Sequence, residues 1–135
     1  MDKGYISSIQ NHLNEIEEEL SEIETELQTN GYLTKLHYRA AERELQLLIE
    51  ACIGLAKQTL KTLNKNCPNE AREVFAKLVS LGLADPEVQW SKIVGMRNAI
   101  VHDYLNFEPQ RIVDVIKTGQ YKVLFQFANQ LLKSN

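Results

Sequence analysis

The sequence predicts an all-α protein, folded as an antiparallel up-and-down bundle of about five helices. Apolar residues recur at spacings of three and four along most of the chain, which is the period of an α-helix. No segment alternates apolar and polar residues as a half-buried strand does. The segments between the periodic stretches are short, and short connections favour antiparallel neighbours in a helical bundle.

The length and composition indicate one domain that covers residues 1–135. A hydrophobic fraction of 44% and a charged fraction of 24% are ordinary for a globular protein. No apolar run approaches the roughly 20 residues that cross a bilayer, and the N-terminus does not read as a secretory signal. We therefore expect a cytoplasmic protein without a membrane segment.

The two cysteines show no metal-ligand spacing to each other or to a histidine. Cys52 falls inside an apolar helical pattern, and Cys67 falls in an expected loop. We expect both to be free thiols, and the sequence suggests neither a bound metal nor a cofactor.

The charge is divided unevenly along the chain. Residues 1–30 contain eight acidic residues against one lysine, a net charge of −7, so the remaining residues carry +4 within the total of −3. A mildly basic body is compatible with nucleic-acid binding, but it is weaker than the concentrated basic patch of a dedicated binding protein. Charge alone therefore predicts no ligand.

The first expected helix ends at Asn30 and Gly31, two residues that tolerate the left-handed backbone of a helix end. Its apolar residues form a heptad seam with alternating spacings of three and four. The seam consists of Ile6, Ile9, Leu13, Ile16, Leu20, Ile23 and Leu27. The next helix should turn back against this seam and complete a helical hairpin.

The second expected helix, residues 34–63, carries two neighbouring apolar stripes. One stripe contains Ala41, Leu45, Leu48, Cys52 and Leu55, and the other contains Ile49, Ile53, Ala56 and Leu60. A helix that is apolar over two sides must be covered on both. The bundle should cover one side, and another subunit is a candidate for the second.

Three further segments complete the expected bundle. A short helix spans residues 70–81. A fourth helix runs from residue 86 to about residue 104, because Asp85 and the proline after it supply an N-cap and a first-turn proline. A last helical segment covers residues 109–132 and bends near Gly119.

The segment RNAIVHDY, residues 97–104, departs from the pattern of the fourth helix. At about 100° per residue, Arg97 falls within the apolar stripe of this helix. A buried guanidinium needs partners because it cannot lose its proton. Two explanations stay open. In a structural role, Arg97 extends past the core to solvent or pairs with a carboxylate such as Glu50; in a functional role, it lines a cleft or subunit interface that receives an anion.

His102 lies one turn beyond Asn98 on the same side of the fourth helix. Arg97 is about 140° away around the helix, so its long side chain must reach around for the two to meet one group. A lone histidine near a helix end more often complements the helix dipole or lies on the surface, and His12 and His37 keep that interpretation. The combination with Arg97 favours acid–base chemistry for His102.

These residues resemble a known signature. The octapeptide from Arg97 to Tyr104 resembles the R-N-x-x-x-H-x-Y motif of HEPN domains, and specifically of HepT-type toxins encoded beside an MNT-type nucleotidyltransferase antitoxin. The stretches RAAERELQLLIEACIGLAK and KLVSLGLADPEVQWSKIVGMRN resemble the family's second helix and its approach to the motif. The resemblance covers nearly the whole chain, and the acidic first helix least specifically.

The resemblance implies a HEPN-like homodimer in which two motifs face each other across a cleft and form a composite ribonuclease site. The implied reaction cleaves RNA, transfer or messenger, without a metal: the ribose 2'-hydroxyl attacks the adjacent phosphate and leaves a cyclic phosphate and a 5'-hydroxyl. His102 is implied to move the protons, and Arg97 to hold the scissile phosphate. Asn98 either orients His102, donates to the phosphate or simply faces solvent.

Tyr104 has a separate implied role, as the residue to which the nucleotidyltransferase attaches AMP. A bulky anionic group about one turn from the catalytic pair would block the cleft and repel RNA phosphates. Arg43 and Glu50 share a face of the second helix and could complete a polar network. Asp103 stands where the family often has a small residue.

Two other functions stay open at this stage. The first is a non-catalytic subunit that binds substrate and presents it to a nucleotidyltransferase, which an all-helical fold cannot exclude. The second is a structural dimer whose heptad helix is the interaction surface. The combination of Arg97, His102 and Tyr104 favours the ribonuclease, because presentation needs no histidine there and a structural dimer leaves Arg97 unexplained.

Overall fold

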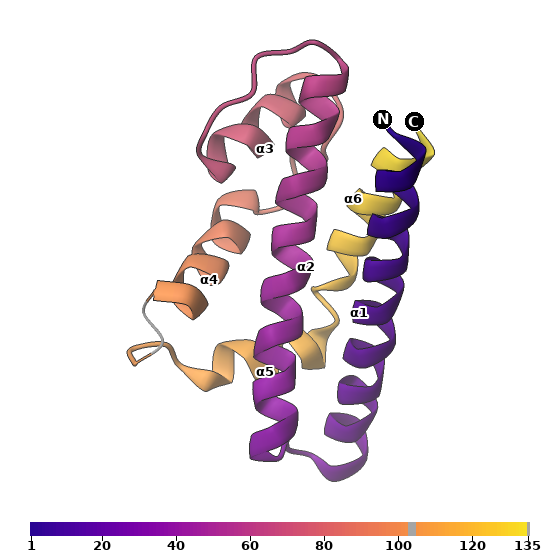
Figure 1. Cartoon of the computed structure of the whole chain (residues 1–135). Helices are drawn as coiled ribbons and strands as arrows, with labels where there is room; N and C mark the ends of the chain where they lie inside the picture. Colours follow the sequence, from indigo (N-terminus) through magenta and orange to yellow (C-terminus); the bar gives the residue numbers. More distant parts are fainter. Residues whose placement is uncertain (103–104, 135) are drawn as a thin grey trace.

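The computed structural model describes residues 1–102 and 105–134, and this part of the chain forms six α-helices and no β-strand (Figure 1). The helices are α1 (Lys3–Asn30), α2 (Lys35–Thr62), α3 (Ala71–Ser80), α4 (Trp90–His102), α5 (Pro109–Thr118) and α6 (Lys122–Lys133). The predicted all-α class is confirmed. Six helices replace the expected five because Gly119 adopts a left-handed φ of 72°, which ends α5 and separates it from α6.

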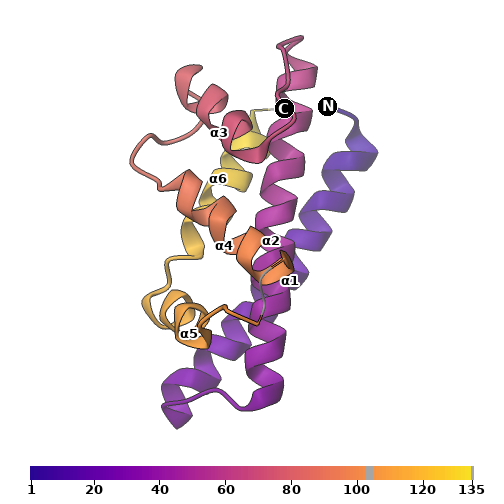
Figure 2. The ribbon, with the colours of Figure 1, turned by 90° about the vertical axis from the view of Figure 1, so that its left-hand side faces the viewer.

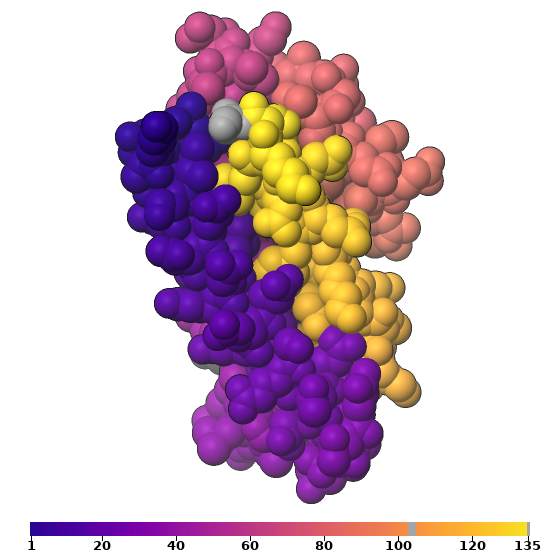
Figure 3. Space-filling view, turned by 90° about the vertical axis from the view of Figure 1, so that its right-hand side faces the viewer, coloured from indigo at the N-terminus to yellow at the C-terminus, as the bar shows by residue number. Residues whose placement is uncertain are grey.

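The long helix α2 is the centre of the bundle and packs against each of the other five described helices. Figure 1 shows α1 running antiparallel to α2, with the two chain ends near each other at one end of the bundle. Figure 2 shows α3, α4 and α5 following one another along α2. On the opposite side of the molecule, α6 lies beside α1 (Figure 3).

The α1–α2 hairpin follows from the heptad seam of the sequence. Five seam residues are buried, namely Leu13, Ile16, Leu20, Ile23 and Leu27. Ile6 and Ile9 are only half-buried, so the seam is weaker near the N-terminus. Gly31 ends α1 with a left-handed φ of 79°, and its N–H donates to the Leu27 carbonyl at 2.8 Å.

A pair of carboxyl groups lies between the two helices of this hairpin. Burial raises the pKa of Glu44 to about 7, and a hydrogen bond with Glu19 contributes to the rise. The negative charge of Glu15 acts in the same direction, while Arg43 opposes it. The hairpin therefore contains a carboxyl group that titrates near neutral pH.

The start of α4 differs from the prediction. The expected helix begins at Pro86, but α4 begins at Trp90 because a tight turn precedes it. The Asp85 carboxylate accepts a 2.9 Å hydrogen bond from the Glu87 amide, so Asp85 caps that turn rather than a helix. The Trp90 indole stacks on Phe75 of α3, with ring centroids 4.5 Å apart, and donates to the Asp85 carbonyl at 3.0 Å. Tertiary packing of Trp90 thus sets where α4 starts.

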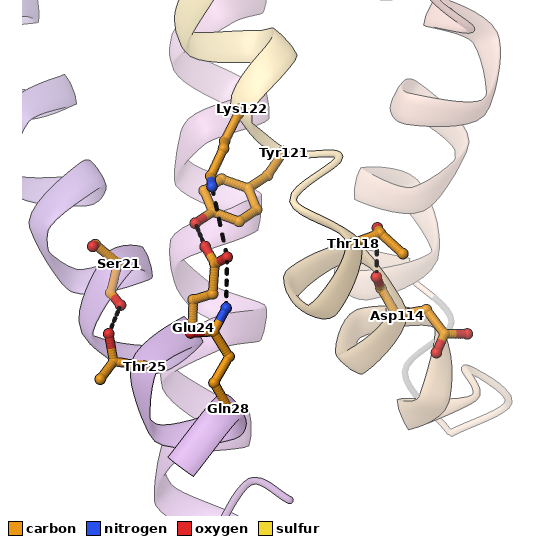
Figure 4. Close-up of polar contacts among 8 residues, drawn as sticks. All are labelled: Ser21, Glu24, Thr25, Gln28, Asp114, Thr118, Tyr121 and Lys122. Atoms are coloured by element: carbon orange, nitrogen blue, oxygen red, sulfur yellow. Dashed lines mark hydrogen bonds and ion pairs between the residues drawn. The ribbon is translucent and has the colours of Figure 1, made fainter. Parts of the chain in front are cut away.

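A polar network fixes the start of α6 to α1 (Figure 4). The Glu24 carboxylate accepts hydrogen bonds from the Tyr121 hydroxyl and from the Gln28 amide at 3.4 Å, and it pairs with the Lys122 ammonium at 3.6 Å. The Glu24 side chain is only 15% exposed, so these partners replace the water that its charge has lost. Burial and the bond to Glu24 raise the pKa of the Tyr121 hydroxyl, which stays protonated as the donor.

Both cysteines are free thiols, Cys52 buried and Cys67 half-buried. Burial raises the pKa of the Cys52 thiol to about 12, so the thiolate that would react is suppressed. In the described ranges, no helix combines the length and the apolar character needed to span a bilayer.

Candidate active site

The last two turns of α4 carry three of the predicted site residues, Arg97, Asn98 and His102. The fourth, Tyr104, lies outside the described residues, as does Asp103. The C-terminal end of a helix carries a partial negative charge, which favours cations there. Of these side chains, only His102 lies in the last turn of α4, where this effect acts.

Arg97 is held from two sides. Its Nη1 lies 3.8 Å from Oε2 of Glu50 on α2, and its Nε donates a 2.9 Å hydrogen bond to the side-chain oxygen of Asn98. The ion pair with Glu50 is one of the two explanations that the sequence left open. The Arg97 side chain is still 25% exposed, and no further hydrogen bond within the described residues occupies its N–H groups. Arg97 is thus fixed in place while it keeps donors for an anion.

Asn98 acts on the arginine, because its side-chain oxygen is the acceptor for Arg97. Across the described part of the chain, no hydrogen bond joins Asn98 to His102. The Asn98 side chain is half-buried, and its NH2 group is left as a donor. Its expected contacts with the histidine and with a phosphate remain predictions.

His102 is exposed at the end of α4. It follows Asn98 by one turn and lies about 140° around the helix from Arg97. No hydrogen bond from another described residue ties down its ring, so both ring nitrogens can meet a bound group. A single α4 therefore presents its arginine and its histidine on different sides.

Both predicted apolar stripes of α2 are buried within the single chain. The second stripe therefore does not require another subunit, because the bundle wraps farther around α2 than the sequence suggested. A third side of α2 is exposed at Leu36, Ala40 and Arg43 and half-buried at Leu47 and Glu50. We call these five residues the open face of α2.

The open face is continuous with Arg97. Leu36 is 79% exposed, and Leu47 is half-buried. Glu50, at the edge of the face, is the ion-pair partner of Arg97. Arg43 lies on the same face but forms no ion pair with Glu50, so the predicted polar network contains Glu50 and Arg97 instead.

A cavity of about 600 Å³ lies on another side of α4, where α4 faces α5 and α6. Ile93 and Met96 line it from α4, whereas Arg97, Asn98 and His102 do not. This cavity is therefore separate from the candidate active site.

The candidate site combines two groups suited to phosphate chemistry. A guanidinium binds a phosphate through paired N–H donors, and an imidazole exchanges protons near neutral pH. Within the described residues, no three His, Cys, Asp or Glu side chains gather to hold a metal ion. Arg97 and His102 are therefore groups that can support phosphoryl transfer at a phosphodiester, although a single α4 presents them on different sides.

Comparison with known proteins shows the family of the chain. The sequence pattern of a family described as Ribonuclease HepT-like matches residues 9–131. The chain belongs to the HepT-like ribonuclease family. The predicted resemblance to HepT-type proteins and the HEPN-like all-α fold are thereby confirmed.

One solved structure similar to this HepT-like protein is described as "Crystal structure of the toxin-antitoxin with AMP-PNP". The two share a TM-score of 0.75 and 22% sequence identity over 97% of this chain and 99% of that chain. At this level of identity the likeness concerns the fold. A comparison with curated protein sequences found no match.

One side chain of this HepT-like protein reaches α4 without having been predicted from the sequence. Arg72, in the first turn of α3, donates from Nε to the Ser91 hydroxyl at 2.9 Å and to the Ser91 carbonyl at 3.3 Å. The two residues lie on different helices, so no local sequence pattern predicts the contact. It becomes visible only because α3 packs against α4.

Proposed function

We propose that this HepT-like protein is the toxin of a toxin–antitoxin pair and a metal-independent endoribonuclease that cleaves transfer or messenger RNA. The observation that carries the proposal is a pair of side chains on α4. Arg97 is held by Glu50 and Asn98 and keeps N–H groups that can donate to a ligand, and His102 is exposed at the helix end. Family membership supports the reaction class. The structural neighbour described as a toxin-antitoxin supports the biological role.

In the proposed reaction, His102 takes the proton of a ribose 2'-hydroxyl. The 2'-oxygen forms a bond to the adjacent phosphorus, and the bond from that phosphorus to the 5'-oxygen of the next nucleotide breaks. The 5'-oxygen receives a proton from the His102 imidazolium, which returns His102 to the neutral imidazole and leaves a cyclic phosphate and a 5'-hydroxyl. Arg97 donates to the non-bridging oxygens and stabilises the charge of the pentacoordinate state.

The proposed site is completed by a second copy of the chain. Arg97 and His102 lie about 140° apart on α4, which makes it difficult for one helix to bring both to one phosphate. In a homodimer, His102 of one subunit can face Arg97 of the other. The open face of α2 is the proposed contact surface, because it exposes Leu36, leaves Leu47 half-buried and ends at Glu50, the ion-pair partner of Arg97.

A charge placed on the open face tests the homodimer. Leu47→Glu should shift the protein to monomers in analytical ultracentrifugation and abolish RNA cleavage. Leu63→Glu is the matched control, because Leu63 is 47% exposed at the other end of α2. A Leu47→Glu protein that remains dimeric would place the interface on a different surface.

The proposed regulation is covalent. An MNT-type nucleotidyltransferase antitoxin would transfer AMP from ATP to the Tyr104 hydroxyl, with release of pyrophosphate. The added negative charge would repel RNA phosphates from the adjacent motif. Incubation with the cognate antitoxin and ATP should add AMP mass to the wild type and none to Tyr104→Phe. Equal labelling of both proteins would reject Tyr104 as the acceptor.

The ribonuclease itself is tested with purified protein and RNA in excess chelator. Cleavage should persist, and Arg97→Ala and His102→Ala should each slow it by about 100-fold or more. His12→Ala is the control, since His12 lies on α1 away from the motif. Equal cleavage by all variants would reject the site. Absent cleavage by the wild type, with a nucleotidyltransferase that needs this chain to bind its substrate, would establish the non-catalytic presenting subunit instead.

A further inference from the structure

Arg72 of α3 extends the candidate site along α4. Its Nε is occupied by Ser91, through the hydroxyl at 2.9 Å and the carbonyl at 3.3 Å. Both residues are exposed at the protein surface. The guanidinium is therefore oriented by α4 although it belongs to α3.

The absence of a side chain at Gly95 lets Arg72 lie against α4. A Cβ at this position would come within 3.0 Å of the Arg72 Nη2. Gly95 lies in the middle of α4, where glycine costs about 1 kcal/mol of helix stability relative to alanine. No turn or positive φ requires a glycine there. The space that it leaves is filled by the tip of Arg72.

Gly95 shares a face of α4 with two residues of the motif. Asn98 follows it by three residues and His102 by seven, spacings that keep all three on one side of a helix. At 1.5 Å of rise per residue, the Arg72 tip is about 5 Å from Asn98 and about 10 Å from His102 along the axis. The face thus presents Arg72, Asn98 and His102 in succession, and Arg97 reaches it only through its hydrogen bond to Asn98.

The outer nitrogens of Arg72 have no acidic partner. Within the described residues, no carboxylate lies within ion-pair distance of its guanidinium. The side chain therefore combines an Nε that is occupied by Ser91 with an Nη2 that lies against Gly95 of α4, and no described residue accepts a hydrogen bond from its terminal N–H groups. This is the arrangement in which an arginine recognises a phosphate through two parallel hydrogen bonds.

We infer that Arg72 binds a second RNA phosphate, next to the one that Arg97 and His102 act on. The inference rests on the proposed function, because it assigns the RNA backbone a path along this face of α4. Arg72 holds the strand in register and takes no part in the proton transfers. Its contact is to the backbone, so it contributes affinity for any sequence rather than a choice of base.

The experiment measures binding of a short single-stranded oligoribonucleotide with 2'-O-methyl riboses, which cannot be cleaved. Fluorescence anisotropy over a series of salt concentrations gives the dissociation constant and its salt dependence for each protein. Arg72→Ala should weaken binding by about ten-fold or more at low salt. It should also reduce the slope of log affinity against log salt by about 0.7, the value for one phosphate contact with a single strand.

Two controls separate a phosphate contact from loss of fold. Arg111→Ala removes the same charge from α5, where Arg111 stacks on Phe107, and should leave affinity and slope unchanged. Arg72→Lys keeps the positive charge but loses the hydrogen bonds to Ser91 and the paired N–H donors of a guanidinium. Compared with Arg72→Ala, it should therefore restore most of the salt slope and only part of the affinity. Melting temperatures of all variants show whether Arg72 only ties α3 to α4.

The outcomes distinguish this inference from the proposed function. If Arg72→Ala binds the oligoribonucleotide with the same affinity and salt slope as the wild type, the role of Arg72 is overturned. This holds even if Arg97→Ala and His102→Ala abolish cleavage. A lowered melting temperature with an unchanged salt slope also overturns it, because Arg72 is then a structural tie. A wild type that binds the oligoribonucleotide through Arg72 but never cleaves RNA supports the phosphate contact and rejects the ribonuclease.

Discussion

The Arg97 guanidinium lies 3.8 Å from the Glu50 carboxylate, an ion pair that leaves the N–H groups of the arginine able to bind an anion. The two side chains are 25% and 39% exposed, so water screens their attraction. Arg97 is also held by Asn98, at 2.9 Å. Glu50 therefore holds Arg97 less firmly than Asn98 does, and it competes for the anion that Arg97 would bind.

Replacement of Glu50 tests this relationship. Glu50→Gln removes a negative charge beside the proposed phosphate and keeps the shape of the side chain. We expect the KM for RNA to fall about two- to five-fold, and the free energy of unfolding to change by less than about 1 kcal/mol. Steady-state cleavage and urea unfolding measure the two effects. A higher KM would show that Glu50 positions Arg97 and does not compete for its ligand.

The Glu44 carboxyl group should make the stability of the hairpin depend on pH. Its pKa rises from the ordinary 4.5 to about 7 in the folded protein, so the folded state binds the proton more tightly than the unfolded chain. This contribution is fully present below pH 4.5 and is lost as the pH rises through about 7. Glu44→Gln keeps a neutral partner for Glu19 and removes the titration.

Urea unfolding over a pH series measures this effect. Glu44→Gln should be more stable than the wild type above about pH 7, and the difference should shrink toward pH 4.5. Glu22→Gln, an exposed change on α1, is the matched control and should show no such trend. A difference between Glu44→Gln and the wild type that stays constant with pH would contradict the assignment.

The network around Glu24 predicts a loss of stability without a change in the site. Tyr121→Phe removes one donor from a carboxylate that is 15% exposed, and should lower the free energy of unfolding by about 1–3 kcal/mol. Tyr38→Phe is the control, because the Tyr38 hydroxyl donates at 2.9 Å to Glu42 on the same helix, where the loss should stay near 0.5 kcal/mol. Equal losses in the two variants would show that the α1–α6 contact does not depend on this hydrogen bond.

The sequence predicted features that depend on local periodicity. The seam of α1 was predicted because its residues repeat at helical spacing, and five of them are buried. The Arg97–Glu50 contact could be anticipated because a guanidinium in an apolar stripe requires a partner, and Glu50 is a carboxylate on the neighbouring central helix.

Features that depend on packing between helices escaped the prediction. Asp85 followed by proline has the same local pattern in a tight turn and at a helix start, and the stacking of Trp90 on Phe75 decides between them. The division at Gly119 was expected as a bend, but it produces two helices. Arg72 gave no signal, because its relation to the motif arises from the packing of α3 on α4.

A substitution at Gly95 tests the proposed path of the RNA along α4 without removing a charge from the protein. Gly95→Ala places a methyl group 3.0 Å from the Arg72 Nη2, and the flexible arginine tip must shift by a few tenths of an ångström. Alanine also favours the helix by about 1 kcal/mol over glycine, so the variant should be no less stable than the wild type. We expect RNA affinity to fall several-fold while the melting temperature stays the same or rises.

A second helical glycine supplies the control. Gly54 lies on α2, where a Cβ would meet only the Tyr5 hydroxyl, at 4.0 Å. Gly54→Ala should therefore gain helix stability without a loss of RNA affinity. Because most damaging substitutions lower stability and binding together, weaker binding in a protein of equal or greater stability points to the displaced guanidinium. Unchanged affinity in Gly95→Ala, with a loss in Arg72→Ala, would mean that Arg72 reaches the RNA without lying across α4.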